Sequence, residues 1–132
     1  MVINVIKEIF TEKAPKPLAP YSQAIMINDS IVFVSGQIPI DPESNEIIYE
    51  PFSKAVEIVF RNISEILNAS GSSLDNVVKV TIYLSSLKYY NELNEIYKKF
   101  FKKPYPARTV IEVSKLPRDA PLEVEVIALL DK

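Results

Sequence analysis

The segment from Leu122 to Leu130 constrains the fold more than any other part of this 132-residue chain. Every second residue in it is aliphatic, as on the core face of a β-strand: Leu122, Val124, Val126, Ala128 and Leu130. The positions between them hold two carboxylates and then two more large aliphatics, Glu123, Glu125, Ile127 and Leu129. A solvent-exposed face does not normally end in large aliphatic side chains. Because the predicted helices suffice for only one face of a sheet, we expect the second face to meet another copy of the chain.

The spacing of apolar and turn-forming residues predicts the other elements. We expect strands over residues 1–10, 23–28, 31–35, 77–84 and 107–113, and helices over 51–70 and 87–101. The order β-β-β-α-β-α-β-β predicts one α/β (α+β) domain over residues 1–132, with both helices on one face of a mixed sheet.

Local signals mark the ends of these elements. Asn28-Asp29 favours a hairpin turn, Gly71 a left-handed stop after the first helix, and Ser86 an N-cap for the second. Strict alternation in 77–84 predicts one core-facing row, made of Val78, Val80, Ile82 and Leu84.

Composition excludes several classes of chemistry. The chain has no cysteine and no histidine, so it lacks thiol nucleophiles, Ser-His pairs and the ligands of an ordinary zinc site. The net charge of −2 argues against nonspecific nucleic-acid binding. No apolar run reaches the roughly 18 residues of a membrane span, and the N-terminus does not resemble a secretory signal. We therefore expect a cytoplasmic protein without a metal site.

Arg108 stands out among the charged residues. It is one of three arginines, and its neighbours in Pro106–Ile111 carry no charge. A guanidinium in a core-bound strand is costly unless it meets an anion. Two interpretations are equally supported at this point: a site for a ligand carboxylate or phosphate, held by two parallel hydrogen bonds, or a salt bridge between strands or between subunits, to Glu112, Glu123 or Glu125.

Other candidates favour structural roles when taken alone. Spacing favours Glu123 and Glu125 as structural partners of Lys79 or Arg108 over a catalytic pair, at roughly two to one. Tyr21, Tyr89 and Tyr90 favour packing. With no histidine to activate it, Ser35 is a poor nucleophile. Gly36 indicates either a close backbone approach or a positive φ.

Taken together and in order, these segments resemble one family. The motifs are Pro20-Tyr21-Ser22-Gln23-Ala24, Ser35-Gly36-Gln37-Ile38-Pro39, 69–74, 77–81, Asn94-Glu95-Ile96-Tyr97, 106–113, Leu116-Pro117-Arg118-Asp119 and Leu122-Glu123-Val124-Glu125. Each motif is weak alone, but their number, order and spacing from about Ala14 to Ala128 resemble the RidA/YjgF family.

The resemblance implies a homotrimer of chorismate-mutase-like subunits with sites between protomers. It implies hydrolysis of 2-iminopropanoate and 2-iminobutanoate, or their enamines, to 2-keto acids and ammonia, without metal or cofactor. By position, Arg108 would clamp the substrate carboxylate and Glu123 would hold the attacking water. The pocket would be completed by Tyr21, Ser35, Gly36, Val110 and Tyr90. The alternatives are a non-catalytic trimer that senses keto acids and, against the acidic charge balance, an RNA-cleaving translation inhibitor.

Overall fold

The computed structural model describes residues 4–131, and its elements follow the expected order. The strands are β1 (Ile6–Ile9), β2 (Ala24–Ile27), β3 (Ile31–Gln37), β4 (Val77–Leu84), β5 (Ala107–Glu112) and β6 (Leu122–Leu129). The helices are α1 (Phe52–Ser70) and α2 (Tyr90–Phe100), and short 3₁₀ turns span Leu74–Asn76, Leu87–Tyr89 and Pro117–Asp119.

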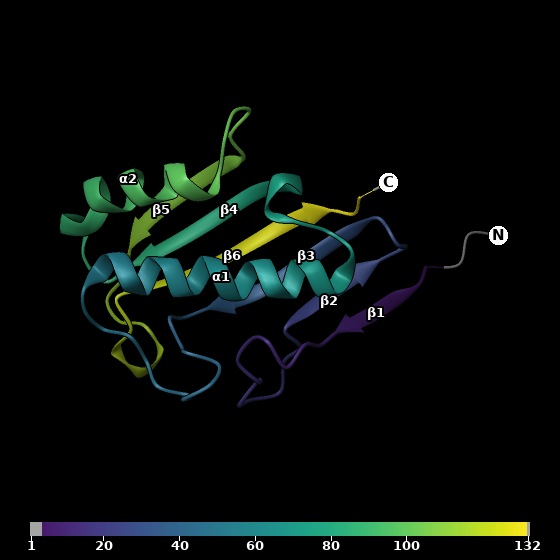
Figure 1. Cartoon of the computed structure of the whole chain (residues 1–132), viewed down its shortest axis with the longest axis horizontal. Coiled ribbons are helices and arrows are strands. Elements are labelled where there is room, and N and C mark those ends of the chain that lie inside the picture. The colour runs from purple at the N-terminus through teal and green to yellow at the C-terminus, as the bar shows by residue number, and fades with distance from the viewer. Residues whose placement is uncertain (1–3, 132) are drawn as a thin grey trace.

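The six strands form one mixed sheet in the order β1-β2-β3-β6-β4-β5. All neighbours are antiparallel except β4 and β5, which are parallel because α2 crosses between them. Both helices lie on the same face of the sheet, with α1 across its middle and α2 beside β5 (Figure 1). The last strand of the chain, β6, lies between β3 and β4 in the interior of the sheet.

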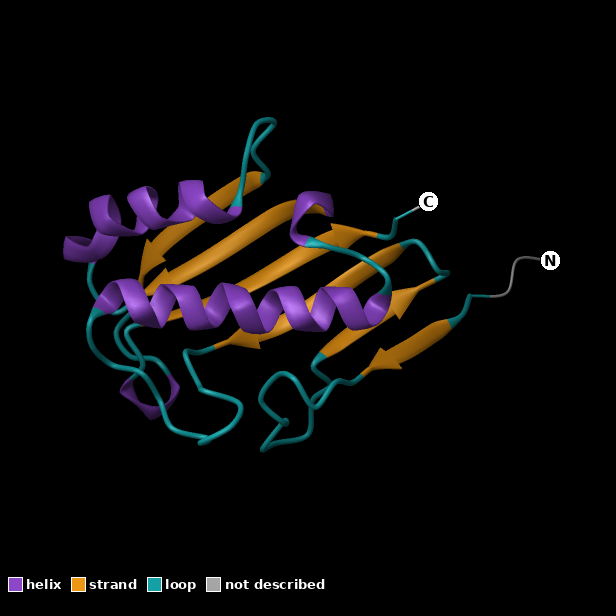
Figure 2. Cartoon of the chain, viewed as in Figure 1, coloured by secondary structure: helices purple, strands orange, loops and turns teal. Residues whose placement is uncertain are grey.

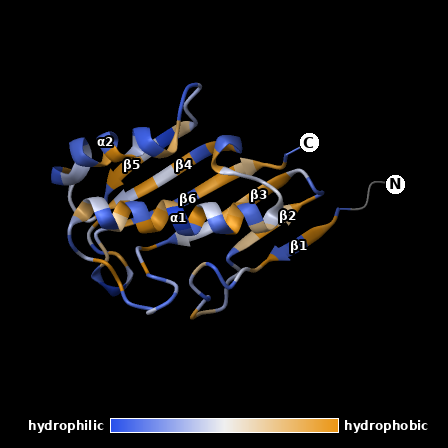
Figure 3. Cartoon of the chain, viewed as in Figure 1, coloured by the Kyte–Doolittle hydropathy of each residue, from blue (hydrophilic) through white to orange (hydrophobic). Residues whose placement is uncertain are grey.

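The core lies between α1 and the sheet. Residues of α1 at helical spacing are fully buried, among them Phe60, Ile63 and Ile66, and each buried side chain of this size contributes roughly 1.5–3 kcal/mol. They meet the inward rows of the central strands, and Figure 3 shows that these strands are largely hydrophobic along their length. Gly71 ends α1 with φ 87, the left-handed conformation expected of a helix stop.

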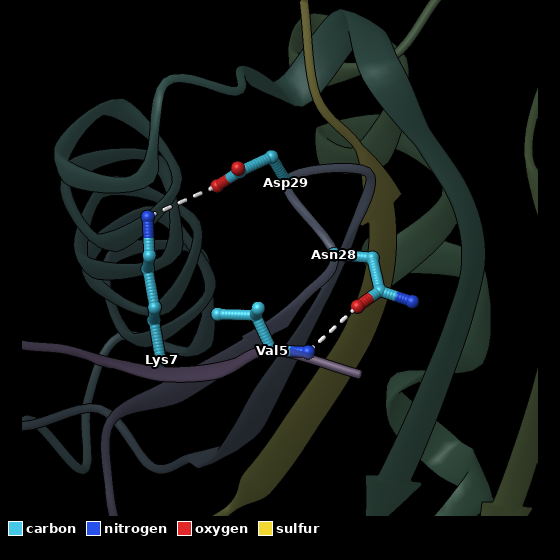
Figure 4. A network of polar contacts seen from close by, with 4 residues as sticks. All are labelled: Val5, Lys7, Asn28 and Asp29. Atoms are coloured by element: carbon cyan, nitrogen blue, oxygen red, sulfur yellow. Dashed lines mark hydrogen bonds and ion pairs between the residues drawn. The ribbon is translucent and has the colours of Figure 1, made fainter. Parts of the chain in front are cut away.

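The hairpin between β2 and β3 forms as predicted at Asn28-Asp29. Both residues have positive φ, 51 and 50, and Ser30 N–H donates to the carbonyl of Ile27 at 3.0 Å. The turn also holds the start of β1, as Figure 4 shows. Val5 N–H donates to Asn28 Oδ1 at 2.8 Å, and Lys7 Nζ lies 3.2 Å from Asp29 Oδ1.

The structure corrects the predicted strand over 77–84. Val78 is 42% exposed, whereas Val77 is buried, because the pairing of β4 with β6 shifts between Val77 and Lys79. A bulge of this kind turns one residue out of the alternation. From Val80 onward the predicted core row is right, with Val80, Ile82 and Leu84 fully buried.

Two elements differ from the prediction by more than two residues at one end. The first strand is Ile6–Ile9, shorter than residues 1–10, and residues 1–3 lie outside the described part of the chain. The second helix begins with a 3₁₀ turn, Leu87–Tyr89, before α2. Ser86 caps that turn, since its hydroxyl accepts from Lys88 N–H at 3.2 Å.

Three long connections, 10–23, 38–51 and 113–121, run along one end of the sheet (Figure 2). Buried Gln23 fixes the first of them. Its side chain accepts from Thr11 N–H at 2.8 Å and donates to the carbonyls of Thr11 and Pro15, both at 3.0 Å.

Within residues 4–131, neither helix is both long and apolar enough to cross a membrane.

Candidate functional site

Arg108 extends from the edge strand β5 toward α2. Its backbone pairs with Val80, and its side chain lies on the helix-covered face. There Nη2 donates to Asn94 Oδ1 at 2.8 Å, and the Tyr90 hydroxyl lies 3.4 Å from the same nitrogen. The guanidinium carbon lies 4.8 Å from the ring centroid of Tyr97, within cation–π range. The guanidinium of Arg108 therefore contacts three side chains of α2, all of them neutral: Tyr90, Asn94 and Tyr97.

The hypothesis of an intrachain salt bridge for Arg108 is wrong within residues 4–131. The carboxylates proposed for it have other surroundings: Glu112 accepts from Leu87 N–H at 2.8 Å, and Glu125 accepts from the Tyr83 hydroxyl at 2.7 Å. Glu123 lies on the opposite face of the sheet, beside Tyr83 in the β4–β6 pairing. The ion pairs among the described residues involve lysines only.

A second group of predicted site residues lines a cavity of about 390 Å³ at the loop-bearing end of the sheet. This cavity brings together Tyr21, Ser35, Gly36 and Glu123. Its walls also carry aliphatic side chains and two cations, Lys16 and Arg118. The Ser35 hydroxyl donates to the carbonyl of Ser22 at 2.6 Å, so toward the cavity it can only accept a hydrogen bond.

Gly36 lets the carboxylate of Glu123 lie against the backbone of β3. A Cβ at residue 36 would stand 2.0 Å from Glu123 Oε2 and 2.9 Å from its Cδ. Gly71 has a positive φ, whereas Gly36 does not. Of the two interpretations of Gly36, close approach is therefore the right one.

The carboxyl of Glu123 has a raised pKa. Burial, which disfavours the charged form, is the larger cause, and the negative charge of Glu125 adds to it. Within the described residues no side chain or backbone group donates a hydrogen bond to this carboxylate, whereas Glu125 is bonded by Tyr83. Glu123 is thus a half-buried base with unused acceptor capacity, facing a cavity.

The predicted site residues form two groups on opposite faces of one sheet. Val110 packs against the core. It lies on the same face as Arg108 because the two residues are two positions apart along β5. Tyr90 contacts Arg108 from α2. Glu123 alternates with the buried Leu122 and Val124, so it points away from the helices. One copy of the chain cannot bring Arg108 and Glu123 to the same small molecule.

Two residues at Arg108 had no predicted role. Asn94 and Tyr97 lie in one of the segments that carry the family resemblance, and with Tyr90 they recur at helical spacing on α2. That spacing was the available signal for a shared face toward Arg108.

Among residues 4–131, no three potential metal ligands lie close enough together to hold a metal ion.

Comparison with known proteins gives consistent similarities. The family model described as Endoribonuclease L-PSP matches residues 11–130. A RutC family protein of Pyrococcus abyssi is 50% identical over 120 residues, 91% of this chain and 94% of that protein. The human 2-iminobutanoate/2-iminopropanoate deaminase is 39% identical over 121 residues, 92% of this chain and 88% of that protein. The crystal structure of E. coli TdcF with bound serine superposes with a TM-score of 0.88 at 35% identity, covering 95% of this chain and 99% of that one.

Proposed function

This chain belongs to the Endoribonuclease L-PSP family, also called RidA/YjgF, and we propose that it hydrolyses short 2-imino acids to 2-keto acids and ammonia. The observation that carries the proposal is the charge of Arg108, held by neutral side chains and open to an anion. The human relative is named for this reaction, and the E. coli relative was solved with an amino acid bound.

The proposed site lies between two copies of the chain. Because Arg108 and Glu123 occupy opposite faces of one sheet, a substrate that needs both takes them from different subunits. The face that carries Glu123 also exposes large apolar side chains, at 41% for Phe33, 44% for Ile111 and 47% for Leu129, which a second subunit would cover. We propose a homotrimer, and light scattering should give a mass of three 15.0 kDa chains.

In the proposed mechanism, Arg108 binds the substrate carboxylate through two parallel N–H donors and thereby fixes C2. Glu123 of a neighbouring copy holds a water and takes one of its protons as the oxygen bonds to C2, while the second electron pair of the C=N bond moves to the nitrogen and Glu123 passes it that proton. Glu123 then takes the hydroxyl proton of the carbinolamine and gives it to the nitrogen, which leaves as ammonia while the C2 oxygen becomes the keto oxygen. The Ser35 hydroxyl, which can only accept toward the cavity, suits the N–H of the imine.

The raised pKa of Glu123 suits the role of base. A carboxylate with a raised pKa is a stronger base while it remains ionised, so it removes a proton from water more readily. Protonation ends this role, so the rate should fall as the pH drops through the raised pKa. Orientation and proton transfer suffice for a substrate whose C=N bond is already electrophilic.

Replacing Arg108 with lysine tests the clamp. The change keeps the charge but removes the planar pair of donors, so kcat/KM for 2-iminobutanoate should fall at least about tenfold, or about 1.4 kcal/mol. The imine can be generated from threonine by a dehydratase, with keto-acid formation followed against the uncatalysed rate. Arg61→Lys, the same change on α1, is the matched control and should leave the rate unchanged.

Two results would contradict the proposal. Full activity in Arg108→Lys would show that the paired donors of Arg108 are not needed to bind the substrate carboxylate. A wild-type protein that binds 2-oxobutanoate but does not accelerate imine hydrolysis would favour the keto-acid sensor instead.

A further inference from the structure

Among residues 4–131, the side chains that contact the guanidinium of Arg108 carry no negative charge. Asn94 contributes a neutral amide oxygen at 2.8 Å, and Tyr97 contributes the face of a neutral ring at 4.8 Å. An arginine this close to a core is usually held by a carboxylate, which pairs with its charge. Here the nearest side-chain acceptor is an amide, so the orientation of the guanidinium is fixed while its charge stays available.

We propose that Asn94 is a positioning residue that holds Arg108 in the orientation that receives the substrate carboxylate, and that its neutrality is essential to this role. The inference rests on the proposed function, because it concerns the same clamp. It adds a residue and a requirement, an acceptor without charge, that the clamp alone does not include.

The donors of the guanidinium support this role. Arginine has five N–H donors, and two of its edges each offer a parallel pair that matches a carboxylate. Asn94 bonds to Nη2, which carries two N–H groups and contributes one to each edge. Whichever of these Asn94 occupies, one complete edge remains. The Tyr90 contact at 3.4 Å is long for a hydrogen bond and can yield to a carboxylate.

The ring of Tyr97 packs against the guanidinium of Arg108 and helps to fix its orientation. Its ring is buried, and its hydroxyl is buried without a hydrogen-bond partner among the described residues. Burial raises the pKa of Tyr97 to about 12, against a smaller lowering by Arg108. The phenol therefore stays neutral at physiological pH and does not compensate the guanidinium.

The surroundings leave room for a ligand. Asn94, Tyr97 and Arg108 line an open cavity of about 580 Å³ between α2 and the segment before β5, together with Asn91 and Tyr105. This cavity is separate from the one that holds Glu123. A ligand carboxylate can approach the free edge of Arg108 from this side.

The test compares three variants by calorimetric titration with 2-oxobutanoate, the keto-acid product of the proposed reaction. Asn94→Asp keeps an acceptor but adds a charge that pairs with Arg108, so affinity should fall at least about tenfold. Asn94→Ala removes the acceptor but leaves the charge, so affinity should fall only about threefold, one ordinary hydrogen bond or less. Asn68→Asp adds the same charge to the exposed surface of α1, away from this cavity, and should change affinity less than twofold.

The order of affinities decides the matter. A merely structural Asn94 would make the alanine variant at least as defective as the aspartate variant, and that order would overturn the proposal. Wild-type affinity in Asn94→Asp would also overturn it. In the imine assay the aspartate variant should show a raised KM with a smaller change in kcat, because the carboxylate is bound in both the ground state and the transition state.

A readout without any ligand separates this inference from the proposed function. The chain has three arginines, so its guanidinium NMR signals are few, and Arg108→Lys assigns one of them. Rotation of the Arg108 guanidinium should be slow in the wild type and faster in Asn94→Ala. Faster rotation supports the positioning role even if no imine hydrolysis is found, whereas unchanged rotation overturns it.

Discussion

Replacing Gly36 with alanine should displace the Glu123 carboxylate without unfolding the protein. The new Cβ would stand 2.0 Å from Glu123 Oε2, so the carboxylate has to retreat by at least about 1 Å to reach van der Waals distance. A misplacement of about 1 Å in a catalytic group can lower a rate by about 100-fold, or about 2.7 kcal/mol in the barrier. Because the clashing atom ends a flexible side chain and Gly36 does not have a positive φ, stability should change by less than about 1 kcal/mol.

Gly71 provides the matched control, since it is the only other glycine. A Cβ there meets nothing within 4 Å, but the residue has φ +87. Gly71→Ala should therefore cost roughly 1–2 kcal/mol of stability through backbone strain and leave the imine-hydrolysis rate unchanged. Thermal melts and the coupled keto-acid assay on both variants measure the two effects separately.

A Gly36→Ala protein with wild-type kcat/KM would refute the role given to the Glu123 carboxylate. A further check uses Glu123→Asp, whose shorter side chain withdraws from residue 36. If the clash is the cause, this substitution should cost less activity in the Gly36→Ala background than in the wild type.

Two other changes follow from the contacts described above. Glu125→Gln removes the negative charge that helps raise the pKa of Glu123, so the acid limb of the pH–rate profile should move to lower pH, while Glu57→Gln on α1 should leave it in place; a shift to higher pH would contradict the electrostatic argument. Gln23→Ala leaves partly buried backbone groups of Thr11 and Pro15 without their side-chain partner and should lower the free energy of unfolding by about 2–4 kcal/mol in urea denaturation. A loss below about 1 kcal/mol would mean that the loop finds other partners.

The periodic elements were predictable because their signals are local. The alternation of β6, the apolar stripe of α1 and the Asn28-Asp29 turn each depend on a few neighbouring residues. The bulge at Val78 was not predictable, since the paired valines at 77 and 78 suit either register and pairing with β6 decides between them.

The arrangement around Arg108 was harder to predict for a different reason. An arginine in an apolar strand suggests a carboxylate partner, and a neutral amide such as Asn94 does not stand out in that search. Strand β5 also alternates weakly, with Thr109 and Ile111 on one face and Arg108 and Val110 on the other. Its sequence therefore did not reveal that Arg108 faces the helices, whereas the alternation of β6 already placed Glu123 on the face away from the core.

The opposite orientations of Arg108 and Glu123 have a genetic consequence under the proposed assembly. Each chain would contribute its Arg108 to one site and its Glu123 to another. A substitution in one chain would therefore inactivate a site that also contains a residue of a neighbouring wild-type chain. Two inactive alleles, one defective at each residue, would complement each other when co-expressed. Random mixing of equal amounts in a closed ring would leave about one quarter of the sites with both wild-type residues.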